Sequence, residues 1–220
     1  ESMKWSLRYW NFEEGPKTLN TIDNLGPPTY TTELDWSDVA STGVDDYSQT
    51  EYSPANTTDC GHPDGVGVHY RGTHVSMINI VPDDQCNHED PVVAPDSCEH
   101  YTAHLSTWIK VDEDFYVSAC FHSDNYGYLY INGQYVAESE WNNWGPYTYS
   151  FTTTGGVSYP NHIGSGPWYR IDMIYHEVSS GDYVHLGFDI NDTPQITDGG
   201  LEYKYIEVGD CFRAEVGTPD

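Results

Sequence analysis

The chain has 220 residues, of which 35 are Asp or Glu and only 8 are Lys or Arg, so its formal net charge is −27. This balance argues strongly against binding to nucleic acid, whose phosphates require basic contacts, and against attraction to an anionic membrane surface. No run of about 18 apolar residues occurs, so no segment is predicted to span a membrane as a helix.

The composition is typical of a turn-rich β-protein, with 19 Tyr, 7 Trp and 6 Phe beside 20 Gly and 13 Pro. Helical periodicity is nearly absent, and the length suffices for one large all-β domain. We therefore expect an all-β fold, an antiparallel β-sandwich with long loop insertions, in a single domain over residues 1–220.

Period-2 alternation predicts the first strand over residues 4–12, with Trp5, Leu7 and Tyr9 on one face. A second extended piece is expected over 30–36 and a further strand within 66–81. Two irregular insertions separate these from the rest, near 37–65 and 82–100. Later strands are predicted at 104–111, 114–122, 127–131, 134–137, 147–152, 169–177, 183–190 and 201–208, with residues 179–182 as a hairpin turn between two of them.

The central segment, residues 121–133, carries the clearest functional signal. A strand ends in Ser123-Asp124-Asn125, a second strand follows, and Asn132-Gly133 closes it with a two-residue hairpin turn. The acidic turn brings several side-chain oxygen atoms together, which indicates a binding site. The alternative interpretation is a common turn in which these side chains accept hydrogen bonds from nearby backbone N–H groups.

The order of these segments resembles the protective-antigen-type β-sandwich domain family, which occurs in bacterial toxins, glycosidases and yeast adhesins. The matching motifs are Leu7-Arg8-Tyr9-Trp10, Gly15-Pro16-Lys17, Leu34-Asp35-Trp36, Ser123-Asp124-Asn125-Tyr126-Gly127, Leu129-Tyr130-Ile131-Asn132-Gly133, and the aromatic strand 169–177 with its Gly181 turn and following strand. The resemblance covers roughly residues 5–190, without the two insertions.

In lectin-like members of that family, a consecutive Asp pair at the strand tip binds calcium, and the ion binds sugar hydroxyls. The resemblance therefore implies a calcium and glycan site at Asp124 and Asn125. Asn125 departs from the family pattern, because an amide carbonyl replaces the second carboxylate and removes one negative charge. Further calcium ligands are expected just after the last strand of the resemblance, at Asp189 and Asp192, with Asn191 and Asp198 as other candidates.

A second group of candidate glycan-binding residues follows the central hairpin, namely Trp141, Asn142, Asn143 and Trp144. Two indole rings around two amides offer a sugar an apolar ring face and directional hydrogen bonds. The alternative is a loop fixed to the sandwich by its tryptophans.

Cysteines and glycosylation sequons favour a secreted, oxidising setting. The sequons are at Asn56 and Asn191, and a glycan on Asn191 would compete with its role as a metal ligand. We predict disulfides between Cys86 and Cys98, which bracket a short loop, and between Cys120 and Cys211, leaving Cys60 free or linked to another chain. The chain begins at Glu1 without a signal peptide, as expected after removal of a leader or for a trimmed piece of a longer protein.

Catalytic motifs are missing from the sequence: it has no Gly-x-Ser-x-Gly elbow, phosphate loop or His-Glu-x-x-His pattern, so no enzymatic activity is expected. The histidine pairs His69/His74 and His100/His104 have suggestive spacings, but we interpret them as ordinary surface or loop residues.

Two functions remain. The first is an extracellular or cell-surface carbohydrate-binding or adhesion module with glycans or glycoproteins as partners, for which the resemblance implies calcium as a cofactor. The second is a structural subunit of an extracellular filament, coat or matrix. Self-assembly would use a β-edge or a swapped terminal strand, for which the strand at 4–12 is the candidate.

Overall fold

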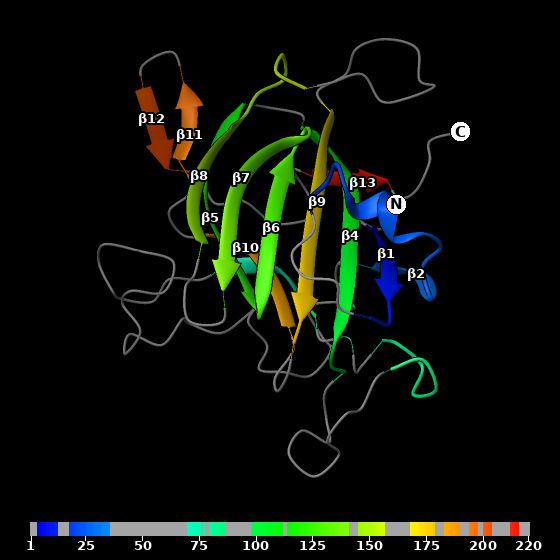
Figure 1. The fold of residues 1–220 in the computed structure, drawn as a ribbon. Coiled ribbons are helices and arrows are strands. Elements are labelled where there is room, and N and C mark those ends of the chain that lie inside the picture. Colours follow the sequence, from blue (N-terminus) through cyan, green and yellow to red (C-terminus); the bar gives the residue numbers. More distant parts are fainter. Residues whose placement is uncertain are drawn as a thin grey trace, which may run out of the picture.

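The computed structural model describes residues 4–12, 18–35, 70–75, 77, 80–86, 98–111, 114–140, 145–156, 168–178, 183–189, 194–197, 200–203 and 212–215. These residues form an all-β fold of antiparallel strands (Figure 1). The strands are β1 Lys4–Trp10, β2 Tyr30–Asp35, β3 Tyr70–Val75, β4 Tyr101–Val111, β5 Phe115–Asp124, β6 Tyr126–Ile131, β7 Gln134–Glu140, β8 Gly145–Phe151, β9 Trp168–Glu177, β10 Tyr183–Asp189, β11 Pro194–Thr197, β12 Gly200–Tyr203 and β13 Phe212–Glu215.

Two sheets make up most of the fold. The large sheet has the order β2-β1-β4-β9-β6-β7, with β13 also paired to β4, and the small sheet has the order β3-β10-β5-β8. β11 and β12 form a separate two-stranded sheet. In the described part of the chain, the one helix is the four-residue 3-10 helix η1 (Ile22–Leu25), and no helix has the length and apolar character needed to cross a membrane.

The core lies between the two sheets and follows from strand alternation. In β1 the predicted inward side chains Trp5, Leu7 and Tyr9 are fully buried, while Arg8 between them points to the outer face. The same alternation in β4, β9 and β6 supplies most of the remaining core residues of the large sheet, and Phe121, Phe151, Val184 and Leu186 come from the small sheet. Apolar burial of this kind stabilises the packed sheets by roughly 25 cal/mol for each Å² removed from water.

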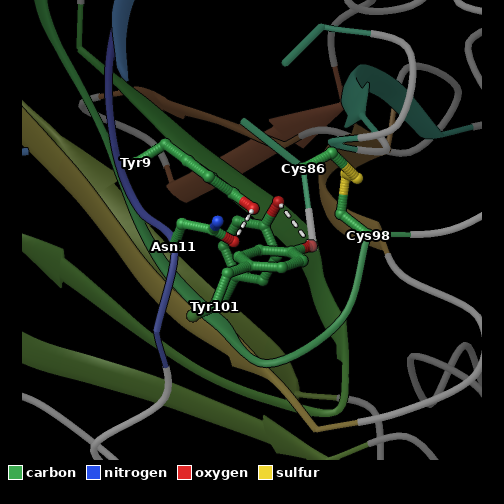
Figure 2. The surroundings of a disulfide bond; sticks show 6 residues. Tyr9, Asn11, Cys86, Cys98 and Tyr101 are labelled. Carbon is green, nitrogen blue, oxygen red and sulfur yellow. Dashed lines mark hydrogen bonds between the residues drawn. A yellow bond between two sulfur atoms is a disulfide. The ribbon is translucent and has the colours of Figure 1, made fainter. Parts of the chain in front are cut away.

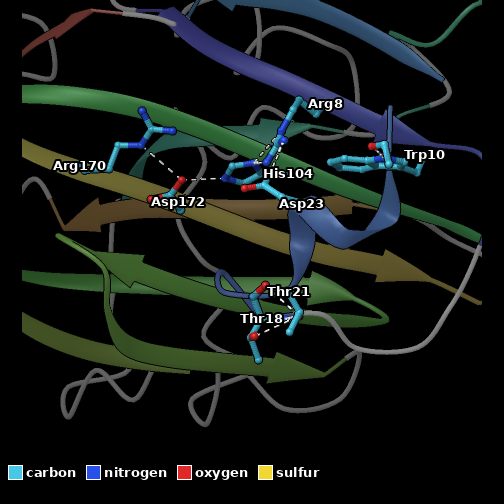
Figure 3. Close-up of polar contacts among 9 residues, drawn as sticks. Arg8, Trp10, Thr18, Thr21, Asp23, His104, Arg170 and Asp172 are labelled. Atoms are coloured by element: carbon cyan, nitrogen blue, oxygen red, sulfur yellow. Dashed lines mark hydrogen bonds and ion pairs between the residues drawn. The ribbon is translucent and has the colours of Figure 1, made fainter. Parts of the chain in front are cut away.

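The outer face of the large sheet carries a second, smaller apolar cluster. Trp10, Ile22, Tyr130 and Ile174 are buried there. Ile22 belongs to η1, so the segment containing this helix lies across the outer face (Figure 3). The Trp10 indole N–H donates a hydrogen bond to the Gly26 carbonyl at 2.9 Å, which fixes the end of that segment.

Several strand predictions are confirmed, and one connection is wrong. Asn132 and Gly133 have φ values of 51° and 76°, as the two-residue hairpin between β6 and β7 requires. In contrast, β9 and β10 do not form a hairpin. β9 pairs with β4 and β6 in the large sheet, whereas β10 pairs with β3 and β5 in the small sheet. The chain therefore passes from one sheet to the other between them.

The strand proposed to mediate self-assembly, β1, does not lie at the edge of its sheet. β1 pairs with β2 along one edge and with β4 along the other, so it is an interior strand of the large sheet. Removing it to swap with another copy would expose fully buried Trp5, Leu7 and Tyr9.

Candidate functional site

One end of the sandwich collects four connections between the sheets. The chain passes between β3 and β4, β5 and β6, β7 and β8, and β9 and β10 at this end, which is the lower end in Figure 1. We call it the tip. Three of these connections are short: Asn125 alone separates β5 from β6, residues 141–144 separate β7 from β8, and residues 178–182 separate β9 from β10.

Strand registers place the predicted site residues relative to one another at the tip. Asp124 is opposite Tyr183, the first residue of β10. Tyr126 pairs with His176 on one side and with Glu140 on the other. Gly145, which begins β8, is opposite Phe121. The strand ends that flank residues 141–144 therefore both lie beside the junction that carries Asp124 and Asn125.

Asn125 joins this junction to the end of β9. Its backbone N–H donates to the His176 carbonyl at 3.4 Å, and its side-chain Oδ1 accepts the Val178 N–H at 2.7 Å. The side chain thus bonds a backbone group, as the alternative interpretation proposed, but that group lies 53 residues away rather than in a local turn. The amide oxygen therefore acts as an acceptor that links the β5–β6 junction to the end of β9.

Close packing behind the junction fixes its position. Ser123 is fully buried, and its N–H donates to the Ser139 Oγ of β7 at 3.0 Å. A Cβ on Gly127 would lie 2.4 Å from the Ser123 Oγ and 2.9 Å from the Phe121 ring. Only glycine permits β6 to approach β5 this closely, so the sequence at position 127 sets the geometry of the strand crossing.

One predicted calcium ligand lies far from the tip. Asp189 pairs with Tyr70 at the opposite end of β10 from Tyr183, the residue that faces Asp124. Asp189 is six residues further along β10 than Tyr183, which corresponds to about 20 Å at 3.3 Å per residue. Asp124 and Asp189 therefore cannot bind the same ion, and the expectation that they do is corrected.

Other predicted residues lie outside the described part of the chain. These are Asn56, Cys60, His69, Trp141, Asn142, Asn143, Trp144, Asn191, Asp192, Asp198 and Cys211, together with the insertion at 37–65. The pairing of Cys120 with Cys211 stays a prediction. Among the described residues, no three His, Cys, Asp or Glu side chains are grouped so that they could hold a metal ion. Calcium requires six or more oxygen ligands, so the described residues at the tip do not by themselves form a calcium site.

The disulfide between Cys86 and Cys98 is confirmed (Figure 2). The two Cα atoms are 5.3 Å apart, and both cysteines are buried within the main core beside Met77 and Val81. The bond therefore links Cys98, just before β4, to Cys86 within the core. Nearby, the Tyr101 hydroxyl donates to the Tyr175 hydroxyl at 3.3 Å.

A chain of charged and polar side chains crosses the outer face of the large sheet (Figure 3), and sequence analysis did not identify it. The His104 Nε2 lies 2.7 Å from Asp172 Oδ1, and Arg170 Nε donates to the same oxygen at 3.3 Å. Arg8 donates to the His104 Nδ1 through two of its nitrogens, at 3.2 and 2.8 Å, and its third nitrogen contacts Asp23 at 2.7 Å. The cluster ties η1, which carries Asp23, to three strands of the sheet.

His104 is neutral in this arrangement. Its Nδ1 must accept from the Arg8 guanidinium, which is a permanent donor, so Nε2 carries the proton and donates to Asp172. Burial lowers the pKa of His104 below its ordinary value of 6.5; the hydrogen bond and charge of Asp172 oppose this shift, and the charges of Arg8 and Arg170 add to it. The expectation that His104 is an ordinary surface or loop residue is therefore wrong: it is 4% exposed and lies in the middle of β4.

The contact with Arg8 also changes the pKa of Asp23. The hydrogen bond and positive charge of Arg8 lower the pKa of this exposed carboxyl. The signal for the cluster was present in the sequence, because the alternation of β1 assigns Arg8 to the outer face and the chain has only 8 basic residues. The other members of the cluster, His104 and Asp172, lie 96 and 164 positions after Arg8 in the sequence. Only the pairing of β1, β4 and β9 brings these residues together.

No family model matches the chain, and no curated protein matches it in sequence. Solved structures similar to it include two adhesin domains. The A domain of Epithelial Adhesin 9 from Candida glabrata, in complex with Galβ1-3GlcNAc, is 13% identical, with 95% of this chain and 92% of that chain covered and a TM-score of 0.44. The sugar-binding PA14 domain of an RTX adhesin is 15% identical, with 94% and 96% covered and a TM-score of 0.37.

An enzyme is also similar in structure. β-Glucosidase from Kluyveromyces marxianus, in complex with glucose, is 9% identical with a TM-score of 0.43; the match covers 84% of this chain, which spans only 16% of the glucosidase chain. At 9–15% identity and TM-scores below 0.5, these similarities assign neither a family nor an activity to this chain.

Proposed function

We propose that this chain is a non-enzymatic carbohydrate-binding adhesion module of the cell surface or extracellular space, which recognises glycans at the tip. The observation that supports the proposal is that four of the connections between the sheets meet at one end. Strand pairing brings Asp124, Asn125 and the strand ends that flank residues 141–144 to that end. In the sequence, two tryptophans and two amides lie between these strand ends, and such residues together with an acidic junction would offer a sugar ring faces and directional hydrogen bonds.

Calcium is part of this proposal. Asp124 and Asn125 would supply oxygen ligands, and their position at the strand crossing is fixed by the bond from Val178 to Asn125 and by the close approach of Gly127 to β5. A rigid support of this kind reduces the free energy needed to organise a binding site. The bound ion would supply coordination to sugar hydroxyls, as the sequence resemblance implies.

The test is binding of the purified chain to a glycan array in the presence of calcium and again with a chelator. The array includes galactosides, because Galβ1-3GlcNAc is the ligand of the yeast adhesin domain described above. We expect binding that the chelator abolishes. Binding that survives chelation would keep the lectin function and remove calcium from it.

Two variants locate the site. Asp124→Asn removes one carboxylate at the tip and is expected to weaken glycan binding at least tenfold. The control Glu138→Gln also replaces a carboxylate with an amide, at an exposed position within β7, and is expected to leave glycan binding unchanged. Equal effects of the two variants would place glycan recognition elsewhere. Absence of all glycan binding would contradict the proposal, and the second hypothesis, a structural subunit, would then be tested by sedimentation at high protein concentration.

A further inference from the structure

A second candidate interaction surface lies on the outer face of β6 and β7. Strand alternation places Tyr126, Tyr128 and Tyr130 of β6 on this face, because Leu129 and Ile131, which alternate with them, point into the core. The register with β7 then sets one partner beside each tyrosine. The pairs are Tyr126 with Glu140, Tyr128 with Glu138, and Tyr130 with Tyr135. We call these six residues the tyrosine–glutamate face.

Aromatic surface on this face is open to solvent. Tyr135 is 53% exposed, the largest exposure of any large apolar residue in the described part of the chain. Its ring meets Tyr130 edge-on with centroids 6.1 Å apart. Tyr126 and Tyr128 are half-buried, and Tyr126 stacks on His176 with centroids 4.9 Å apart, so the rings are held rather than freely rotating.

The face also carries negative charge that no described basic residue offsets. Glu138 and Glu140 are exposed, and within the described residues no ion pair joins either of them to Lys, Arg or His. The two arginines of this sheet face, Arg8 and Arg170, are engaged with Asp23 and Asp172. Burial, together with a hydrogen bond to Glu138 and its charge, raises the pKa of Tyr135 to about 12.

Spacing indicates the form of the ligand. Glu138 and Glu140 are two residues apart on one strand face, which separates them by about 7 Å. That distance equals the spacing of alternate side chains in an extended peptide. A cationic side chain between a tyrosine ring and a carboxylate gains both cation–π and ion-pair attraction.

We propose that the tyrosine–glutamate face binds an extended segment of a partner protein that carries Lys or Arg at alternate positions. Each basic side chain contacts one carboxylate of β7 and the tyrosine rings beside it, which are Tyr128 and Tyr135 for Glu138 and Tyr126 for Glu140. The face adjoins the tip at Tyr126 and Glu140, but its proposed ligand differs from a glycan, because a neutral sugar would leave the two carboxylates without a charged partner.

The test compares two capped peptides of equal composition and charge, Ser-Lys-Ser-Lys-Ser and Ser-Lys-Lys-Ser-Ser, titrated into the intact chain at low salt and followed by NMR shifts of the β6 and β7 amides. We expect the alternating peptide to bind at least threefold more tightly. The double variant Glu138→Gln/Glu140→Gln should weaken it at least tenfold, and Tyr135→Ala, which changes no charge, at least threefold.

The matched control is Asp83→Asn/Asp84→Asn, which removes two exposed charges from a turn outside this face. It is expected to change the affinity less than twofold. An equal loss in this control would mean that the peptide responds only to the net charge of −27, which overturns the proposal. Equal affinity of the two peptides, full binding by Tyr135→Ala, or no binding by the unmodified chain would each overturn it as well. Lectin activity at the tip is measured separately, so its failure leaves this result unaffected.

Discussion

Gly127→Ala tests whether the strand crossing at the tip is as tightly packed as the structure indicates. The added methyl would lie 2.4 Å from the Ser123 Oγ, 2.9 Å from the Ser123 Cβ and 2.9 Å from the Phe121 ring. All three contacts are shorter than Cβ atoms tolerate. Neither neighbour moves easily, because Phe121 and Ser123 are fully buried and Ser123 is also bonded to Ser139.

The magnitude follows from two opposing effects. Overpacking a buried site by one methyl costs about 1–3 kcal/mol, and contacts this short favour the upper end of that range. Replacing glycine with alanine returns about 0.4–1 kcal/mol by restricting the unfolded chain. We therefore expect a net loss of about 2 kcal/mol in the free energy of unfolding, or roughly 4–8 °C in Tm for a chain of this size.

Urea unfolding followed by tryptophan fluorescence measures this loss, and two further variants check its cause. Ser123→Ala removes the atom at 2.4 Å, so adding it to Gly127→Ala should recover part of the loss. Gly133→Ala has open space around the new methyl but a φ of 76°, so it should cost about 1–2 kcal/mol through backbone strain, with no recovery from Ser123→Ala. A loss below about 0.5 kcal/mol for Gly127→Ala would refute the packing argument.

Three further predictions concern the other features of the fold. Because the pKa of His104 is lowered on folding, the unfolded chain binds more protons, so the free energy of unfolding should fall as pH drops below 6.5. His104→Gln should flatten that dependence in urea titrations from pH 5 to 8, and an unchanged slope would contradict the assignment. Asn125→Ala removes the acceptor of the Val178 N–H and should cost about 1 kcal/mol and speed amide exchange at Val178, whereas Asn125→Asp keeps the acceptor and should preserve both. The double variant Cys86→Ser/Cys98→Ser opens a loop with a sequence separation of 12 and should cost about 2–4 kcal/mol in urea unfolding, whereas a loss below about 0.5 kcal/mol would contradict a stabilising role for this bond.

Local signals in the sequence predicted local structure correctly. Alternation of apolar residues predicted both the strand at β1 and its buried face, since a two-residue period and a half-buried strand are the same physical pattern. Asn132-Gly133 predicted its turn because few other residue pairs tolerate two positive φ values. Close spacing of Cys86 and Cys98 on either side of one short loop predicted their bond.

Partner choice between strands could not be predicted in the same way. A short connection between two extended segments has the same sequence signature whether it joins neighbours in one sheet or passes between two sheets. The sequence therefore predicts a hairpin of β9 and β10, which in the structure belong to different sheets. That pairing also decides which end of β10 faces Asp124, and hence excludes Asp189 from the tip. The cluster around His104 likewise depends on contacts between strands distant in sequence, for which no local pattern exists.

The convergence of connections at the tip has a consequence for how such a domain can diversify. Each connection begins and ends at strand residues whose positions are set by sheet pairing and by a shared core. Doubling the length of a loop whose ends are held costs only about 0.6 kcal/mol in closure entropy. Residues 141–144 could therefore be lengthened or randomised in a library with little loss of stability, while the single residue at position 125, whose side chain bonds Val178, could not. New binding specificities would be sought in the first segment and never in the second.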